Sequence, residues 1–215
     1  KTGKVHCWGL NSFGQLGVNI DPKNLEKYKS SEINLLENII SLALGDNHSC
    51  ALNKTGEVFC WGDNREGQLG SKKIQESAQP TKVTALSKIM MITAGQNHSC
   101  ALNTSGEVYC WGDNQSWQIG GNRIEDISPV TQVQGVRNVK QISAGGMTSC
   151  AVTVHGDVFC WGDNTSGQAG QLNTSEEQNS KIKIPLQIEI PKKIDSVTVG
   201  DIHTCALSVV KTVYC

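Results

Sequence analysis

Short runs of β-branched and apolar residues alternate with turn residues along the whole chain. The run from Ile89 to Ala94 ends at Gly95, and the run from Ser99 to Leu102 ends at a turn that carries Gly106. A third run, Val108 to Trp111, follows directly. Short runs bounded by glycine and asparagine favour β-strands over helices. The pattern predicts an all-β chain in which successive runs pair as hairpins.

The same pattern recurs as an internal repeat. The Trp-Gly pair occurs at Trp8, Trp61, Trp111 and Trp161, and so at intervals of 53, 50 and 50 residues. A period near 50 excludes short solenoid repeats and is typical of a propeller blade made of four short strands. We expect one partial propeller over 1–215. The approximate repeats are 1–38, 39–88, 89–138, 139–193 and 194–215.

Nine cysteines follow this repeat. Gly56 closes a three-residue turn of the type I plus G1 bulge kind, which needs positive φ at its last position. Counting outward from it places Cys50 opposite Cys60 in a non-hydrogen-bonded pair, with Cα atoms about 4.5 Å apart, a distance compatible with a disulfide. The predicted disulfides are Cys50–Cys60, Cys100–Cys110, Cys150–Cys160 and Cys205–Cys215. Cys7 stays unpaired, and 208–212 has no glycine, so a different turn is expected there.

Segments of variable length follow each Trp-Gly pair. A fixed framework with variable connectors is how repeat proteins carry specificity, so we expect partner contacts in these connectors. Trp117 replaces the glycine found at Gly14, Gly67 and Gly167, and it is either a binding anchor or packed onto an adjacent connector. The connectors are Val18 to Asn38, Ser71 to Ser87, Gly121 to Asn138 and Gln171 to Lys193.

The string Gly-x-x-His-Ser-Cys-Ala-Leu-x-x-x-Gly-x-Val-(Phe/Tyr)-x-Trp-Gly-x-Asn-x-x-Gly-Gln-Leu-Gly resembles the regulator-of-chromosome-condensation repeat. It is found at 45–70, 95–120 and 145–170. The resemblance implies a seven-bladed propeller of four-stranded antiparallel blades. Its members include an exchange factor for a nuclear small GTPase, a secreted β-lactamase inhibitor and binding modules, and fold alone does not choose among these. Seven blades need about 350 residues at this period, so we expect about four blades of a longer propeller.

Candidate chemistry is sparse. His48, His98 and His203 recur at one blade position, but Thr148 stands there in the third copy, which favours a structural role near the glycine turn. A ten-residue cysteine spacing is unlike zinc-site spacing. No nucleophile–base pair or phosphate loop recurs. We therefore expect no enzyme, no metal and no cofactor.

Charge and cysteine usage address partners and location. Lys plus Arg is 19 and Asp plus Glu is 20, which gives no reason to expect nucleic acid or membrane insertion. Cysteine pairs in register indicate an oxidising compartment, and we expect an extracellular or cell-surface location. Such a location would make glycosylation relevant, and the sequons predicted to lie in loops are Asn114, Asn164 and Asn173.

Three hypotheses for function remain open. The first is a secreted binding scaffold that recognises protein or glycan through its connectors. The second is an intracellular nucleotide-exchange or chromatin-associated regulator like the nuclear family members. The third is a structural repeat unit of an extracellular filament or sheath, for which self-assembly of copies is expected.

Overall fold

The computed structural model describes residues 3–21, 23, 26–71, 75–121, 126–170 and 180–215. These residues form antiparallel sheets joined by turns, and every regular element among them is a strand. No helix long and apolar enough to cross a membrane occurs in this part of the chain. The prediction of an all-β chain is confirmed.

Three sheets are complete four-stranded meanders, each one blade of a propeller. The first contains β3 (Ile39–Leu44), β4 (His48–Asn53), β5 (Val58–Asp63) and β6 (Glu76–Lys82). The second contains β7 (Ile89–Ala94), β8 (His98–Asn103), β9 (Val108–Asp113) and β10 (Ile127–Gln132). The third contains β11 (Val139–Gly145), β12 (Thr148–Thr153), β13 (Val158–Asp163) and β14 (Lys181–Ile188).

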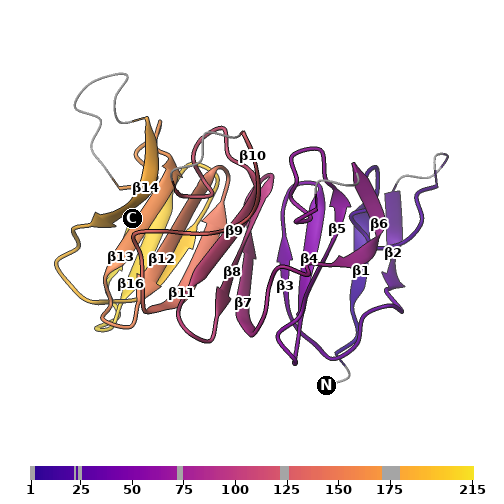
Figure 1. Cartoon of the computed structure of the whole chain (residues 1–215), viewed down its shortest axis with the longest axis horizontal. Coiled ribbons are helices and arrows are strands. Elements are labelled where there is room, and N and C mark those ends of the chain that lie inside the picture. The colour runs from indigo at the N-terminus through magenta and orange to yellow at the C-terminus, as the bar shows by residue number, and fades with distance from the viewer. Residues whose placement is uncertain (1–2, 22, 24–25, 72–74, 122–125, 171–179) are drawn as a thin grey trace.

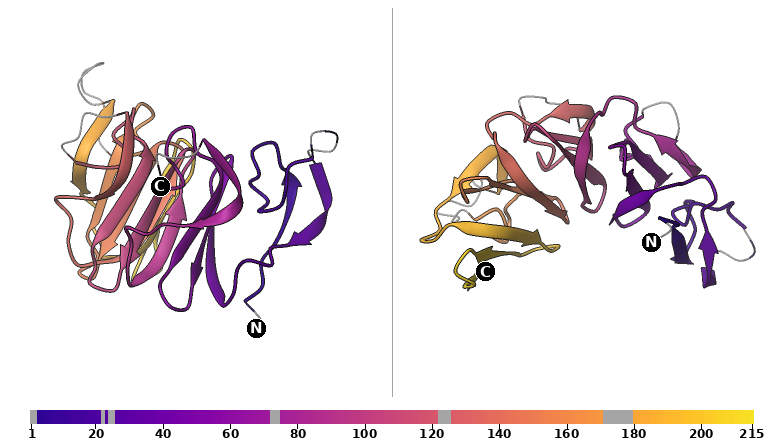
Figure 2. Two further views of the ribbon diagram at one scale, coloured as in Figure 1. Left: turned by 45° about the vertical axis from the view of Figure 1, so that its right-hand side comes forward. Right: turned by 90° about the horizontal axis from the view of Figure 1, so that it is seen from below.

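A smaller sheet lies at each end of this series. The first pairs β1 (His6–Leu10) with β2 (Glu26–Glu32). The last contains β15 (Ile194–Val199), β16 (Thr204–Ser208) and β17 (Val213–Tyr214). The sheets follow one another along an arc, with the N-terminal and C-terminal sheets at its two ends (Figure 1; Figure 2, right).

The hairpin register is as the turn count predicts. Cys50 pairs with Cys60 and Leu52 with Val58, and the same register holds in the β8–β9 and β12–β13 hairpins. Gly56 has φ of 79°. The different turn expected at 208–212 is wrong, because Lys211 takes the glycine position with φ of 67° and the same backbone bonds form. A non-glycine residue can adopt this conformation at a cost of about 1–2 kcal/mol.

The outermost strand of each blade lies inside a segment predicted to be a connector. β6, for example, falls within Ser71 to Ser87, although its sequence is polar and contains Pro80. Proline and polar side chains are tolerated there because an outer strand has an unpaired edge facing solvent. The variable segments are therefore part loop and part strand.

Adjacent sheets pack face to face and bury the core between them. Ile92, Ile142 and Val197 occupy equivalent positions on inner strands β7, β11 and β15, and each is at most 7% exposed. Their counterpart Leu42, on β3, is 45% exposed. In three sheets this position is therefore buried by the neighbouring blade. On β3 it stays exposed, because the β1–β2 sheet does not cover Leu42.

Because each blade is a meander, its loops gather at two opposite ends. The β3–β4 and β5–β6 loops lie at one end, and the β4–β5 turn and β6–β7 loop lie at the other. We call the first of these ends, together with the β1–β2 loop, the connector face; it is formed by residues 11–21, 23, 45–47, 63–71, 75–76, 95–97, 113–121, 126, 145–147, 163–170, 180–181 and 200–203. We call the second the turn face, formed by 33–38, 54–57, 83–88, 104–107, 133–138, 154–157, 189–193 and 209–212.

Candidate protein-interaction face

An asparagine and a glutamine hold in shape each connector-face loop that follows β1, β5, β9 or β13. The Asn64 Oδ1 atom accepts the backbone N–H of Leu69 at 2.8 Å, and the Gln68 Oε1 atom accepts that of Glu66 at 3.0 Å. The loops that follow β1, β9 and β13 repeat both bonds. These side chains, buried except for the half-buried Gln15, satisfy backbone donors that a bare loop would leave to water.

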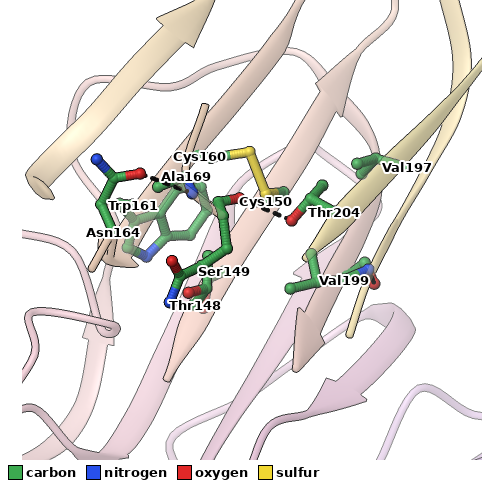
Figure 3. The surroundings of a disulfide bond; sticks show 12 residues. Thr148, Ser149, Cys150, Cys160, Trp161, Asn164, Ala169, Val197, Val199 and Thr204 are labelled. Atoms are coloured by element: carbon green, nitrogen blue, oxygen red, sulfur yellow. Dashed lines mark hydrogen bonds between the residues drawn. A yellow bond between two sulfur atoms is a disulfide. The ribbon is translucent and has the colours of Figure 1, made fainter. Parts of the chain in front are cut away.

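Each of these loops is bound by the next blade. The Gln68 carbonyl accepts the indole N–H of Trp111 at 2.8 Å and the hydroxyl of Ser99 at 3.2 Å. Trp161 and Ser149 bind the Gln118 carbonyl in the same way. Figure 3 shows Trp161 on one side of the Cys150–Cys160 pair and Thr204, Val197 and Val199 on the other. The connector face is therefore a fixed surface that repeats from blade to blade.

The recurrent histidines join the blades below this face. His48 Nε2 lies 2.8 Å from Ser99 Oγ, and His98 Nε2 lies 2.9 Å from Ser149 Oγ. Each serine already donates its hydrogen to a glutamine carbonyl, so it accepts from the imidazole. Burial lowers the pKa of His48 to about 4 and that of His98 to about 3. Both rings are neutral and structural, bonded to a side chain of the next blade.

The charged side chains of the connector face are mostly acidic. The acids are Asp21, Asp46, Asp63, Glu66, Glu76, Asp113, Asp126, Asp163 and Asp201, against Lys23, Arg65 and Lys181. Arg65 is paired with Asp63 at 2.7 Å. The stretches of sequence that lie outside the described residues between these ranges contain three bases and three acids, Lys72, Lys73, Arg123, Glu125, Glu176 and Glu177.

The pKa values of two of these acids are raised. Burial raises the pKa of Glu66, and the negative charges of Asp113 and Asp63 raise it further. Burial also raises the pKa of Asp113, an effect that nearby Asp126 reinforces and backbone hydrogen bonds oppose. Both shifts come mainly from burial, and the positive charge of Arg65 opposes the shift in the pKa of Glu66.

The turn face has a different balance of charge. Its acids are Glu37, Glu57, Glu107, Asp157 and Glu189, and its bases are Lys54, Lys88, Arg137, Lys192, Lys193 and Lys211. Asp157 is paired with Lys193 at 2.7 Å, and Glu57 with Lys82 of β6 at 2.5 Å. The chain's net charge of −1 conceals this difference between the two faces.

Trp117 lies on the connector face and is half-buried. It has φ of 65°, as its glycine counterparts Gly67 and Gly167 also have positive φ. The Lys183 ammonium lies 5.0 Å from the centre of its ring. The structure thus gives Trp117 a neighbour on β14, within the connector segment expected from sequence, and its role as a binding anchor stays a prediction.

The four predicted cysteine pairs lie at bonding distance across their hairpins. The Sγ atoms are 2.07, 2.04, 2.10 and 2.16 Å apart in chain order, and every Cα–Cα distance is 4.1 Å. Cys7 is free and half-buried. The oxidation state of these pairs in the cell stays a prediction.

The glycosylation sites proposed from sequence are not supported. Asn114 is 7% exposed and Asn164 is fully buried, and each side chain accepts a backbone N–H within its own loop. A glycan attached to either amide would disrupt that loop. Asn173 lies outside the described residues.

Nothing in the described residues groups side chains for catalysis or metal binding. No set of three or more His, Cys, Asp or Glu residues within them could hold a metal ion. His48, Ser99 and Cys50 do approach one another, with Ser99 Oγ 3.8 Å from Cys50 Sγ, but all three are buried. What the connector face offers is a rigid acidic surface for binding.

Comparison with known proteins identifies the family. The RCC1-like domain model matches residues 1–215. Human protein RCC2 is 47% identical over 68 residues, covering 32% of this chain and 13% of the relative. The dog X-linked retinitis pigmentosa GTPase regulator is 37% identical over 78 residues, covering 36% of this chain and 8% of the relative.

Solved structures show the same fold over nearly the whole chain. Yeast RCC1 (Prp20) bound to Kap60 matches with a TM-score of 0.82 and 24% identity, over 99% of this chain and 51% of the other. A second structure, of Prp20p from Saccharomyces cerevisiae with its binding to Gsp1p and histones, gives 0.79 and 25%, over 96% and 52%. This chain therefore spans about half the length of these structures.

These relatives correct the expected location. GTPase regulation, Gsp1p and histones belong to the interior of the cell, so the extracellular or cell-surface assignment is wrong. The physical reason is that strand register brings the paired cysteines together in any compartment, and buried cysteines also pack as small apolar residues. The secreted scaffold is accordingly unsupported, and the nuclear-type regulator fits better. The chain belongs to the RCC1-like domain family.

Proposed function

We propose that this chain is a non-catalytic, protein-binding part of an intracellular RCC1-like regulator, and that its connector face binds a basic segment of a partner protein. The observation that carries the proposal is the excess of carboxylates on the connector face. Asp63 and Asp113 of this set are buried, whereas the other carboxylates are exposed or half-buried. The backbone that carries Glu66 is fixed by buried hydrogen bonds, so this charge is held in place before a partner arrives.

Charge complementarity favours a Lys- and Arg-rich partner. Surface carboxylates attract basic segments over about 8–10 Å at physiological salt. Histones, which are basic, are named for yeast Prp20p. A basic protein tail of this kind is the partner class that the connector face suits, and the turn face, with its mixed charges, suits it less.

The test compares two charge-neutralised variants. Glu76→Gln with Asp126→Asn removes two exposed charges from the connector face, and Glu37→Gln with Glu189→Gln removes two from the turn face. Each is titrated with a fluorescent Lys/Arg-rich peptide and followed by anisotropy. We expect about 5–30-fold weaker binding for the connector-face variant, at roughly 0.5–1 kcal/mol for each of the two charges.

Salt and the matched control make the result decisive. Binding should weaken steeply as ionic strength rises, because exposed charges are screened. The turn-face variant should bind within about twofold of the parent chain, since its charges lie at the far end of the blades. Equal losses in both variants, or equal binding of a Glu/Asp-rich peptide, would contradict the proposal.

A further inference from the structure

The carboxylates of the connector face are concentrated over the first two complete blades, β3–β6 and β7–β10. The acids described there are Asp46, Asp63, Glu66, Glu76, Asp113 and Asp126, against Arg65. Over the β11–β14 and β15–β17 sheets, the described residues of this face carry Asp163 and Asp201, against Lys181. The described part of the face therefore has an acidic half and a nearly neutral half.

One loop position changes from polar to apolar between these two halves. It is occupied by Asn47 and Asn97 in the acidic half, and by Met147 and Ile202 in the other. The backbone makes the same bond whichever side chain is present, because the carbonyls of Asn47, Asn97 and Met147 each accept an aspartate N–H at 2.9 Å. The blade does not require an apolar residue at this position, so folding does not explain Met147 and Ile202.

Met147 and Ile202 lie on neighbouring turns. A Cβ added to Gly146 would collide with the Asp201 carbonyl oxygen, so the β11–β12 and β15–β16 turns are in contact. Ile202 is 62% exposed. Asn97 and Met147 are partly exposed although a sheet packs on each side of their blades. The position therefore faces solvent inside the series as well as in the last sheet.

This apolar position adjoins the acidic half of the face. The Met147 thioether accepts the Ser116 hydroxyl at 3.4 Å. Ser116 belongs to the loop that follows β9, which also begins at the carboxylate of Asp113. A partner segment that lies across this border contacts carboxylates on one side and Met147 on the other.

We propose that the connector face binds a partner segment that combines a run of Lys and Arg residues with an apolar side chain at one end. The bases lie over the β3–β6 and β7–β10 blades, and the apolar side chain contacts Met147 and Ile202. The inference rests on the function proposed above, which supplies the basic run, and adds the composition and placement of the segment. Methionine adapts to apolar side chains of different shape, and a surface with one charged and one apolar half selects such segments over purely basic ones.

The test uses three fluorescent peptides with the same number of Lys and Arg residues. One has glycines at both ends, one has two leucines at its N-terminus, and one has them at its C-terminus. Anisotropy titrations should give about 3–10-fold tighter binding for one of the leucine peptides than for the glycine peptide, since a leucine on this surface is buried only in part. The order that binds more tightly gives the direction of the segment along the face.

The three methionines of the chain give a direct readout of the contact. Met90 and Met91 lie at the turn-face end of β7, and Met147 lies on the connector face. With isotope-labelled methionine methyl groups, the tighter leucine peptide should shift the NMR signal of Met147 and leave those of Met90 and Met91 in place. The glycine peptide should shift the Met147 signal less.

Substitution to the residue of the first two blades tests the site. Met147→Asn with Ile202→Asn should lower the affinity for the leucine peptide to that for the glycine peptide, whose own affinity should stay within about twofold. Val154→Asn with Val209→Asn removes two exposed apolar side chains from the turn face and should change neither affinity. Ile202→Asn alone changes an exposed side chain, so it should keep the melting temperature and weaken binding of the leucine peptide by about 2–3-fold.

The outcomes separate this inference from the function on which it rests. Binding of the glycine peptide with no gain from leucine would leave the acidic surface in place and overturn the apolar contact. An equal loss in the turn-face variant, or an unshifted Met147 signal, would also overturn it. Failure of all three peptides to bind would refute the proposed function, and this inference with it.

Discussion

The two inner blade interfaces and the outer one solve the same contact differently. Between β3–β6 and β7–β10, and between β7–β10 and β11–β14, a buried histidine bonds to a serine of the next blade. At the outer interface, with β15–β17, Thr148 replaces the histidine and its hydroxyl turns back to the Asp163 carbonyl at 2.9 Å. The cross-blade bond at this position is therefore dispensable.

Another polar group joins the sheets at the outer interface. The Gln141 side chain donates to the Val197 carbonyl at 2.9 Å and accepts the Val197 N–H at 3.0 Å. At the equivalent inner position, Met91 offers only a sulfur atom, 3.4 Å from the Ile142 nitrogen. Polar side chains therefore form hydrogen bonds across each of these interfaces. At the two inner interfaces one of these side chains is a titratable histidine.

The largest expected difference is in pH dependence. The folded-state pKa values of about 4 for His48 and 3 for His98 lie below the unfolded value near 6.5. Below pH 6.5 the unfolded chain binds protons that the folded chain does not, so stability falls with pH until the folded pKa is reached. Each histidine should cost about 3 kcal/mol between pH 7 and pH 4.

The natural Thr148 supplies the control variant. A chain with His48→Thr and His98→Thr should lose less unfolding free energy between pH 7 and 4 than the parent, measured by urea denaturation at each pH. The carboxylates titrate equally in both chains, so the difference between their losses of unfolding free energy is due to the two imidazoles. Parallel pH profiles for the two chains would show that the rings are not desolvated as described.

The cysteine pairs should show the second largest contrast. Cys50–Cys60, Cys100–Cys110 and Cys150–Cys160 are at most 2% exposed, whereas Cys215 of the last pair is exposed. We expect mild reductant to open Cys205–Cys215 first in the folded chain, and the inner pairs only on unfolding. By the chain-entropy model each bond contributes about 2–3 kcal/mol.

Mass spectrometry after alkylation at increasing reductant checks both parts. The non-reduced chain should carry one free thiol, at Cys7. Four free thiol pairs under native, non-reducing conditions would refute the predicted disulfides. Simultaneous reduction of all four pairs in the folded chain would refute the contrast between inner and outer blades.

The sequence predicted the hairpins well because their determinants are local. The Gly56 turn fixes the register by itself, and alternation then decides which residues face each other. The outer strands were missed because residues such as Ser77 and Gln79 in β6 lack the apolar alternation that identifies a half-buried strand.

The acidic face was missed for a different reason. Its carboxylates lie in loops separated by about 50 residues, the repeat period, and only stacking of the blades gathers them on one side. The net charge sums over both faces and so hides the difference. The cysteine pattern correctly predicted which sulfur atoms lie close together. This closeness does not specify the cellular compartment in which the protein is found.

A smaller difference is expected from the hydroxyls that bind the glutamine carbonyls. Ser149→Ala removes the acceptor of His98 and one donor to Gln118, leaving a fully buried N–H unpaired at a cost of about 1–3 kcal/mol. Thr204→Val at the outer interface removes only the bond to Gln168 and should cost about 0.5–1.5 kcal/mol. Unfolding free energies at pH 7 measure both.

A double substitution assigns the excess to the histidine. In a chain that already carries His98→Thr, Ser149→Ala should cost no more than Thr204→Val does, because the imidazole N–H is gone. If the double-mutant cycle of His98 and Ser149 gave no coupling energy, the hydrogen bond between these two side chains would contribute nothing to stability.

The smallest effect on stability is expected for Trp117→Gly. The change relieves a positive φ that costs about 1–2 kcal/mol and removes a contact with Lys183 of about 0.5–1 kcal/mol. These two contributions leave a net of about 0–1.5 kcal/mol in favour of the variant, so the melting temperature should stay the same or rise slightly. Gly167→Trp tests the reverse, because no atom lies within 4 Å of an added Cβ there.

Partner binding then separates the two roles left open for Trp117. If the side chain is an anchor, Trp117→Gly should weaken binding of the partner by about 2 kcal/mol, roughly 30-fold, with folding intact. If it only covers Lys183 of β14, affinity should stay within about twofold and the lysine should become more reactive to acylation. Affinity and Lys183 labelling, measured on the same variant, give opposite answers for the two roles. A fall in melting temperature with unchanged affinity would support packing onto the adjacent connector, because it would mean that this packing contributes more than the strained φ costs.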